Sequence, residues 1–298
     1  MFTNNQITKG SIKIAKDADN TFYYTDLTRE EASKDFEKLP DTIVSSDGFK
    51  PTAPTSIKQR FVTMLLGSAG CGKSFYVNKL VKDYKENYPN SEIFYISACD
   101  LDEDPSYEES RKYINEIDVF KMETSIDFKA FNAFEKSLVI FDDTDSAFST
   151  SQDYKLVAPN MTKEEYDKLP IKSKKQISNE IVDKCNMASV NVNNTLLSLI
   201  KNGRKFNISV LYISHKPFDG RIQSNMISEC TSIVLYPSST NRDTLKTFLN
   251  KKLSLNKDQA KRLMTFKKWY MYDYLEIFYR VSRPFFVSDN VISIIEDF

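Results

Sequence analysis

The amino-acid sequence predicts an α/β fold in which a mostly parallel central sheet is flanked by helices. Three observations indicate this fold. Short apolar runs of strand length recur along the chain, segments with apolar residues at helical spacing lie between them, and a glycine-rich turn joins the first of these strands to the first of these helices. Strands that alternate with helices form parallel sheets whose strands are buried on both faces.

The predicted elements follow in a regular order. Strands are expected at 61–66, 92–97, 137–142, 208–214 and 231–236. Helices are expected at 27–39, 75–84, about 177–203, 242–250 and 257–266. The tail has the pattern of a hairpin formed by 268–273 and 275–281. Between the core elements, 102–109 is expected to form an acidic surface turn and helix start, and 151–176 is polar and rich in lysine.

Composition limits the classes of protein to consider. The chain has 298 residues, of which 41% are hydrophobic and 28% charged, as in ordinary soluble globular proteins. Lys and Arg together number 41, as do Asp and Glu, so net charge gives no indication of a nucleic-acid partner. No apolar run approaches the roughly 20 residues of a membrane span, and the first residues lack a signal-peptide pattern. The four cysteines have no metal-ligand spacing, which favours reduced thiols in an intracellular, cytoplasmic protein.

The turn after the first strand matches the phosphate-binding pattern G-x-x-x-x-G-K-[ST], or P-loop. The residues expected to bind nucleotide are Gly67, Ser68, Ala69, Gly70, Cys71, Gly72, Lys73 and Ser74. Glycines let successive backbone N–H groups point at phosphate oxygens, and the positive end of the following helix attracts the anion. Lys73 is expected to contact the β- and γ-phosphates of ATP, and the Ser74 hydroxyl to bind Mg²⁺. The alternative is a plain glycine turn between strand and helix.

A second element completes the predicted nucleotide site. The strand at 137–142 ends in Asp142, followed by Asp143. Ligands bind at the C-terminal edge of parallel sheets, so Asp142 is expected to hold Mg²⁺ directly or through water. Asp143 is the candidate base that orients or deprotonates the attacking water, with Asp145 a weaker candidate. An acidic strand-to-turn boundary would have the same pattern without this role.

Two further residues are candidates for catalysis. His215, the only histidine, follows the strand at 208–214, where it can touch the γ-phosphate or the attacking water. Arg204 follows a helix-ending glycine and is a candidate arginine finger for a neighbouring subunit's ATP. The alternatives are an ordinary hydrogen-bonded strand-end histidine and a solvated basic residue.

Motor-type ATPases have an extra strand between the P-loop strand and the strand that carries the Mg²⁺-binding aspartate. They also have an acid directly after that aspartate. In this chain the predicted strand at 92–97 intervenes in sequence, and Asp143 follows Asp142. Both features favour the motor-type class of P-loop NTPase, with a RecA-like or ASCE-like sheet.

Three segments of the chain, the P-loop at 67–74, the acidic strand end at 138–143 and the segment 202–215, resemble the genome-packaging ATPases of large DNA viruses and virophages. These ATPases are the poxvirus-type branch of the FtsK/HerA superfamily. The chain departs from that pattern twice: Lys205 stands where histidine is frequent, and His215 where glutamine is frequent. The match covers about 61–236. The chain is accordingly divided into an N-terminal extension or linker (1–58), a P-loop ATPase core (59–240) and a C-terminal extension packed on the core (241–298).

The resemblance implies a ring of five or six identical subunits that hydrolyses ATP to move double-stranded DNA into a capsid, without reading its sequence. It implies location at a virus assembly site or in the virion, and contact with a capsid vertex protein. It also implies a DNA-facing loop, here 151–176, whose lysines are Lys163, Lys168, Lys172, Lys174 and Lys175. A solvated surface loop is the alternative for that segment. For the whole chain, the alternatives are a helicase or phage-assembly ATPase, a small-molecule P-loop kinase and a nucleotide-switched scaffold.

Overall fold

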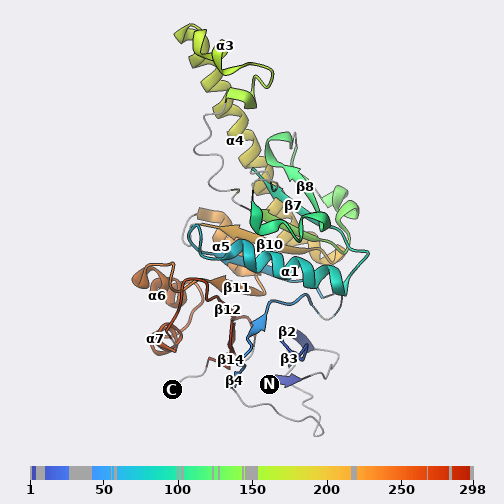
Figure 1. Cartoon of the computed structure of the whole chain (residues 1–298), viewed down its shortest axis with the longest axis vertical. Coiled ribbons are helices and arrows are strands. Elements are labelled where there is room, and N and C mark those ends of the chain that lie inside the picture. The colour runs from blue at the N-terminus through green and yellow to red at the C-terminus, as the bar shows by residue number, and fades with distance from the viewer. Residues whose placement is uncertain are drawn as a thin grey trace.

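The structure is a computed structural model of the chain. It describes residues 2–4, 11–26, 42–54, 56, 59–98, 101, 104–122, 124–126, 128–142, 144, 154–215, 220–266, 268–281 and 284–295. The helix expected at 27–39 lies outside these residues, as do Asp143 and Asp145. Figure 1 shows a central sheet between helices, with one long helical projection.

Two groups of strands form the central sheet, in the order β4-β14-β13-β12-β11-β6-β10-β9-β7-β8. The parallel group consists of β6 (Val62–Leu66), β7 (Ile93–Ser97), β8 (Ile114–Asp118), β9 (Leu138–Asp142), β10 (Ser209–Ser214) and β11 (Ser232–Leu235). The antiparallel group consists of β12 (Leu275–Phe278), β13 (Phe285–Ser288), β14 (Val291–Ile294) and β4 (Thr42–Val44). The predicted mostly parallel α/β sheet is therefore confirmed.

The order of the inner strands places the nucleotide motifs. β10 lies between the P-loop strand β6 and the acidic strand β9, so the extra strand of the motor-type arrangement is present. That strand is not the expected one, because β7 pairs on the far side of β9. The strands are in register at their C-terminal ends: Leu66 pairs with Ser214, and Ile213 with Asp142. The segments that follow β6, β9 and β10 therefore begin at one edge of the sheet.

Helices cover both faces of the sheet (Figure 1). On one face, Tyr76, Val77 and Leu80 of α1 (Lys73–Asn87) pack in a core with alternate residues of the parallel strands. The core on the opposite face contains residues of four helices: α4 (Ile171–Asn202), α5 (Gly220–Glu229), α6 (Arg242–Lys251) and α7 (Lys257–Thr265). The parallel strands other than β8 are covered on both faces, so their sequences are mostly apolar, and this explains why those strands were predictable.

Shorter helical elements connect the main ones. They are η2 (Pro105–Tyr107), η3 (Arg111–Tyr113), η4 (Val119–Lys121), η5 (Phe128–Phe134), η6 (Tyr154–Leu156), α3 (Lys163–Lys168) and η7 (Gly203–Phe206). The acidic turn expected at 102–109 is represented by η2 in its described part. Asp104 begins this turn, and its carboxylate accepts a hydrogen bond from the Ser106 N–H group.

The N-terminal residues form a second sheet, which the sequence analysis did not predict. Its strands are β1 (Phe2–Asn4), β3 (Phe22–Asp26), β2 (Ser11–Asp17) and β5 (Phe49–Lys50), in that order. Ile14, Ala15 and Phe49 pack in a small core with residues of β12, β13 and β14. The N-terminal sheet thus shares a core with the C-terminal strands.

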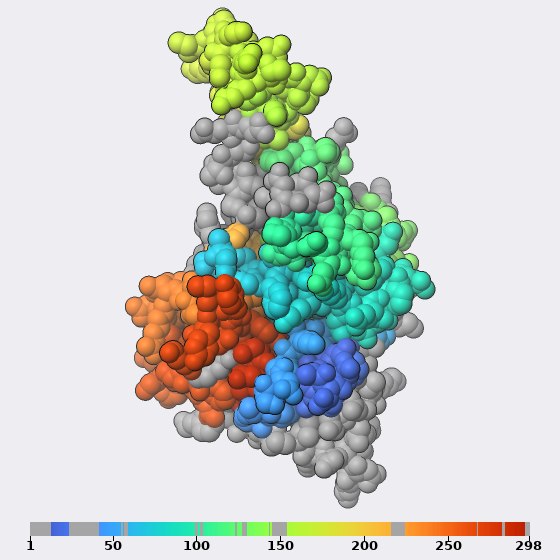
Figure 2. Space-filling model, in the orientation of Figure 1, coloured from blue at the N-terminus to red at the C-terminus, as the bar shows by residue number. Residues whose placement is uncertain are grey.

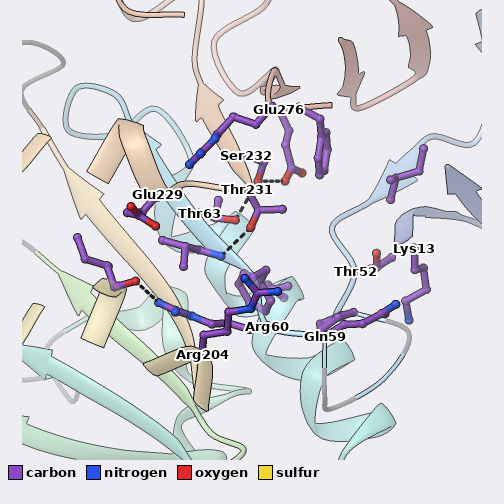
Figure 3. Close-up of a pocket in the computed structure, with 18 of the residues that line it drawn as sticks. Lys13, Thr52, Gln59, Arg60, Thr63, Arg204, Glu229, Thr231, Ser232 and Glu276 are labelled. Atoms are coloured by element: carbon purple, nitrogen blue, oxygen red, sulfur yellow. Dashed lines mark hydrogen bonds between the residues drawn. The ribbon is translucent and has the colours of Figure 1, made fainter. Parts of the chain in front are cut away.

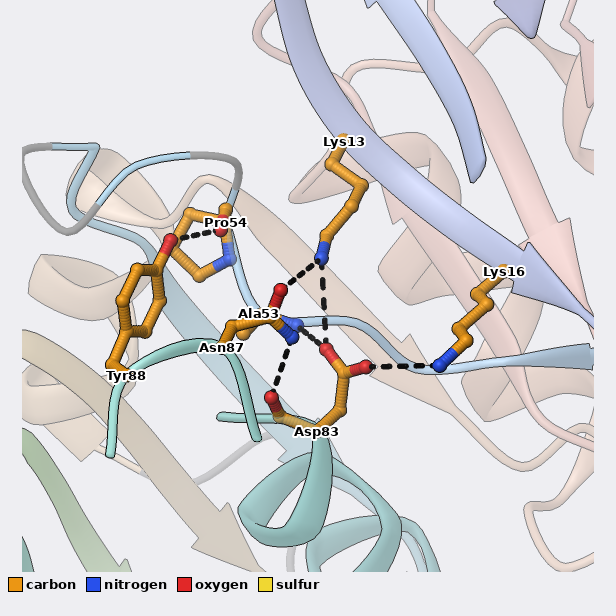
Figure 4. A network of polar contacts seen from close by, with 7 residues as sticks. All are labelled: Lys13, Lys16, Ala53, Pro54, Asp83, Asn87 and Tyr88. Carbon is orange, nitrogen blue, oxygen red and sulfur yellow. Dashed lines mark hydrogen bonds and ion pairs between the residues drawn. The ribbon is translucent and has the colours of Figure 1, made fainter. Parts of the chain in front are cut away.

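A polar network fixes the N-terminal sheet to α1 (Figure 4). The buried Asp83 carboxylate accepts a hydrogen bond of 2.7 Å from the Ala53 N–H group. It also lies 3.7 Å from the Lys13 ammonium and 3.9 Å from that of Lys16. Burial lowers the pKa of Lys13, and the Asp83 charge partly offsets that effect. A buried carboxylate with two cationic neighbours and an amide donor is satisfied, so this contact orders the N-terminal strands against the P-loop helix.

The lysine-rich segment is helical, which corrects the expected loop at 151–176. α3 begins with a capping box between Thr162 and Glu165, and α4 begins at Ile171 rather than near 177. No glycine or proline occurs from 171 to 202, and lysine, glutamine and glutamate favour helices. Figures 1 and 2 show α3 and the start of α4 projecting from the body.

The predicted tail is partly correct. The helices expected at 242–250 and 257–266 are confirmed as α6 and α7. The expected hairpin has the wrong first strand, because β12 pairs with β11 on one side and β13 on the other. Residues 270–273 instead form a turn. A hydrogen bond of 3.1 Å from the Asp273 N–H group to the Tyr270 carbonyl oxygen closes it.

Candidate functional site

The backbone of the P-loop requires glycine at particular points. Gly72 caps the N-terminus of α1 with φ of 106°, which side chains other than glycine rarely adopt. At Gly67 the requirement is space, because an added Cβ atom would lie 2.5 Å from the Cys71 sulfur. The loop is therefore held between β6 and α1 in a shape that other residues would distort.

Lys73, the first residue of α1, is buried and strongly hydrogen-bonded. Its ammonium donates to the carbonyl oxygens of Gly67 and Ser68, each at 2.8 Å. It also contacts Nδ1 of His215 at 3.1 Å. An ammonium has three donors and no acceptor, so a phosphate oxygen that reaches Lys73 competes with these acceptors for its N–H groups.

His215 is placed beside the P-loop, as its position after β10 predicts. Because the Lys73 ammonium can only donate, Nδ1 of His215 is the acceptor in this contact. The ring lines the same cavity as Ser74. His215 therefore shares the cavity wall with Ser74 and directly contacts the residue expected to bind phosphate.

Asp142 is oriented by a tyrosine from the neighbouring strand β7. The Tyr95 hydroxyl donates to Oδ2 of Asp142. Burial is the largest cause that raises the pKa of Tyr95, with further contributions from Tyr107 and Asp142. Tyr95 is thus a neutral donor that fixes the carboxylate at the end of β9.

Lys73 and Asp142 share one cavity of about 630 Å³. Its other polar wall residues include Ser74, Asp104 and Ser97, and the Ser74 hydroxyl donates to Oδ2 of Asp104 at 3.4 Å. Hydroxyl and carboxylate oxygens are the ligands that Mg²⁺ prefers, and Mg²⁺ usually retains several waters. Ser74 and Asp142 are therefore the residues that would hold a magnesium ion, and Asp104 is hydrogen-bonded to Ser74 beside them.

The remaining loop residues have different surroundings. Ala69, Gly70 and Gly72 line the cavity, while Ser68 contributes the carbonyl oxygen that binds Lys73. Cys71 is buried, and burial raises the pKa of its thiol. A thiol in that state is a poor nucleophile, which favours a packing role for Cys71.

Arg204 lies at the other edge of the sheet, in η7 ahead of β10. Six residues of β10 at roughly 3.3 Å each place it about 20 Å from the P-loop edge. It lines a separate cavity of about 570 Å³ with Arg60 and Glu229 (Figure 3). Arg60 donates to the carbonyl oxygens of Leu199 and Ile200, whereas Arg204 is exposed. Arg204 is thus not part of its own chain's nucleotide site.

Sequence reasoning did not identify several residues of the cavity wall, among them Tyr95, Asp104 and Tyr272. Tyr95 lies within an apolar strand, where its hydroxyl has no sequence signal. Asp104 belongs to an acidic run after β7, and its place after a parallel strand was the available signal. Tyr272 comes from the turn before β12 and is brought to the P-loop only by the sheet order.

Comparisons with known proteins concern the fold. No protein-family model and no curated protein matches the chain. Among solved structures, it is similar to the DNA-packaging ATPase B204 from Sulfolobus turreted icosahedral virus, with 12% identity, 76% of this chain and 96% of that chain covered, and a TM-score of 0.44. The genome packaging NTPase B204 from Sulfolobus turreted icosahedral virus 2 in complex with ATP-gammaS has the same identity and coverage and a TM-score of 0.40. VirB4 of Thermoanaerobacter pseudethanolicus is 12% identical over 98% of both chains, with a TM-score of 0.42. At these identities and scores the function must be argued from the site itself.

Proposed function

We propose that the chain is a Mg²⁺-dependent ATPase that works as a homo-oligomeric ring and moves double-stranded DNA into a viral capsid. The observation that carries the ATPase part is that Lys73, Ser74, Asp142 and His215 line one cavity at the C-terminal edge of a parallel sheet. Ligands of parallel α/β sheets bind at this edge. A P-loop, a strand-end carboxylate and an adjacent polar side chain there are what ATP hydrolysis needs.

Each residue has a proposed role. The amides of the loop 67–74 bind the phosphates, and Lys73 neutralises charge that develops on the transferred phosphoryl group. Ser74 and Asp142 hold Mg²⁺, which stabilises charge on the phosphate oxygens when bound. Asp143, which directly follows Asp142 in sequence, accepts a proton from the attacking water. His215 orients that water or the γ-phosphate and adjusts the position of Lys73 through their contact.

The position of Arg204 supports a ring. It is exposed and far from its own P-loop, so an arginine finger at this position can act only on the ATP of a neighbouring subunit. Such residues raise turnover by roughly 10³–10⁵. The separation of Arg204 from Lys73 is therefore compatible with a site completed between subunits, in a pentamer or hexamer.

The proposed DNA contact is the lysine tip, defined as Lys163, Lys168, Lys172, Lys174 and Lys175 on α3 and the start of α4. The tip lies on the projection, away from the body (Figure 2). Lysines there can follow phosphates of any sequence, and such binding weakens steeply with salt. Glu164, Glu165 and Asp167 reduce the positive charge of the tip, so we expect moderate affinity.

The remaining parts of the proposal rest on the motif resemblance. They are the division into 1–58, 59–240 and 241–298, contact with a capsid vertex protein, and location at a virus assembly site or in the virion. Within the described residues, no helix is both long and apolar enough to cross a membrane. The same ATP site would serve a helicase or a phage-assembly ATPase, so the nucleic-acid substrate must be tested directly.

The decisive test of function is ATPase turnover with and without long duplex DNA across a salt series. We expect DNA to stimulate turnover and the stimulation to fade as salt rises. Replacing Lys172 and Lys175 with glutamate should remove the stimulation while basal turnover persists, and replacing Lys257 and Lys261 of α7 provides a charge-matched control away from the tip. Stimulation only by single strands would favour a helicase, and stimulation only by a small-molecule acceptor would favour a kinase.

A further inference from the structure

The nucleotide cavity continues past the P-loop. A neighbouring cavity of about 440 Å³ shares three wall residues with it: Gly72, Phe75 and Tyr272. The two hollows therefore meet at the N-terminus of α1. The phosphate-binding residues line the first cavity, and residues of the N-terminal sheet and the C-terminal strands line the second, including Lys50 and Asp289.

Two large aromatic side chains at this junction are exposed. The exposed fractions are 68% for Tyr272 and 59% for Phe75. An ideal Cβ atom at Gly72 would be 3.5 Å from the Tyr272 ring, so the ring lies against the P-loop backbone. The Lys79 ammonium lies 4.2 Å from the centre of the Phe75 ring, which leaves Phe75 only partly engaged by protein. Exposed aromatic rings beside the loop expected to bind phosphates indicate a ligand with an apolar face.

The turn that carries Tyr272 is fixed on both sides. Asp273 accepts a hydrogen bond of 2.9 Å from the Tyr270 N–H group. The Tyr270 carbonyl accepts one of 2.7 Å from the Ser238 hydroxyl, which ties the turn to the segment after β11. A ring on a braced turn loses little freedom when a ligand stacks on it, so it is preorganised for binding.

The sheet order gives the direction of a bound nucleotide. Asp142 and His215 follow β9 and β10, on one side of the P-loop strand β6. Tyr272 precedes β12, on the other side. A triphosphate whose terminal phosphate is near Asp142 and whose inner phosphates lie over the N-terminus of α1 therefore directs its nucleoside toward Phe75 and Tyr272.

We propose that Tyr272 is the stacking platform for the nucleobase, with Phe75 as a second apolar contact. This inference rests on the proposed ATP site and adds its base-binding part. Every base has a π-face that can stack on a tyrosine ring. The two-ring system of a purine covers more of that ring than a pyrimidine does, so the platform favours purine nucleotides.

The test compares two probes, Mg-ATP and Mg-tripolyphosphate, by equilibrium binding to the full chain. Both reach the P-loop, but only ATP carries a base. Tyr272→Ala should weaken ATP binding by roughly 5- to 150-fold, the range for one stacked base, and leave tripolyphosphate binding unchanged. Tyr272→Phe should bind ATP like the parent. Tyr270→Ala is the matched control, because Tyr270 is exposed in the same turn and lines neither cavity.

The outcomes separate the two proposals. If the parent chain binds both probes and Tyr272→Ala binds ATP equally well, the base platform is refuted while the phosphate site stands. If the parent binds neither probe, the ATP site fails and the platform with it. Photocrosslinking with 8-azido-ATP adds an independent readout: label on the peptide containing Tyr272 or Phe75 supports the platform, and label confined to other segments overturns it.

Discussion

Glu276 on β12 makes stability depend on pH in a way that can be measured. Its side chain is buried, and burial raises its pKa to about 7, although hydrogen bonds of 2.7 Å from Ser232 and 2.9 Å from Tyr76 lower it in part. Tyr76 and Tyr274, which face it, have raised pKa values and stay neutral near pH 7. Glu276 is therefore the group in this contact that titrates.

The direction of this pH dependence follows from the coupling between proton binding and folding. The pKa of Glu276 is higher in the folded chain than the 4.5 of a free glutamate, so the folded state holds its proton more tightly. The protonated Glu276 carboxyl therefore favours the folded state. This stabilisation is complete below pH 4.5 and is lost as pH rises through about 7. The difference between the two pKa values corresponds to a loss of roughly 3 kcal/mol in free energy of unfolding, and this loss is complete only above pH 7.

The substitution Glu276→Gln keeps the shape of the side chain but removes its ionisable group. As pH rises from 5 to 8, the parent should lose roughly 2 to 3 kcal/mol in free energy of unfolding that the variant does not lose. Urea unfolding of both proteins at each pH measures this difference. Glu165→Gln is the control: its pKa is lowered by hydrogen bonds from Thr162, so its difference from the parent should be flat over this range. A constant difference between parent and Glu276→Gln from pH 5 to pH 8 would refute the argument.

Three further predictions concern catalysis. Lys73→Ala should lower ATP turnover by roughly 10²–10³ or more, because the transferring phosphoryl group loses its cation, while Lys82→Ala on the same helix should not; unchanged turnover in the first variant would remove the site assignment. Asp143→Asn should bind ATP with near-normal affinity in an equilibrium assay and turn over roughly 10²–10⁴ more slowly, and near-normal turnover would place the base elsewhere. Arg204→Ala should lower turnover, and mixing it with Lys73→Ala should restore some activity, because mixed rings pair an intact P-loop with an intact arginine. Absence of rescue would argue against an arginine that acts between subunits.

The sequence was most informative where structure depends on neighbours in the chain. The strand, glycine loop and helix over 62–87 were predictable because the motif, the apolar run and the helical spacing are all local. The strands β9, β10 and β11 were predictable because burial on both faces makes them continuously apolar. The aligned ends of β9 and β10 then follow from parallel pairing.

Long-range pairing explains what the sequence did not reveal. β8 is an edge strand with the sequence Ile-Asn-Glu-Ile-Asp. Its polar residues interrupt the apolar pattern of a buried strand, so the sequence does not indicate its pairing with β7. β2 and β3 are short, mixed strands that acquire a role only through the second sheet and its contact with β12–β14. The hydrogen bond between Tyr95 and Asp142, and the contact of Tyr272 with the P-loop, join residues 47 and 200 positions apart, which no local pattern records.

The central claim is that ATP and Mg²⁺ bind where the loop 67–74 meets the end of β9. The most direct measurement is a crystal structure of the chain with a non-hydrolysable ATP analogue and Mn²⁺, in which anomalous scattering locates the metal. We predict phosphates within the loop and a manganese peak beside the Ser74 hydroxyl and the Asp142 carboxylate. A nucleotide bound elsewhere, or a metal remote from both side chains, would contradict the account.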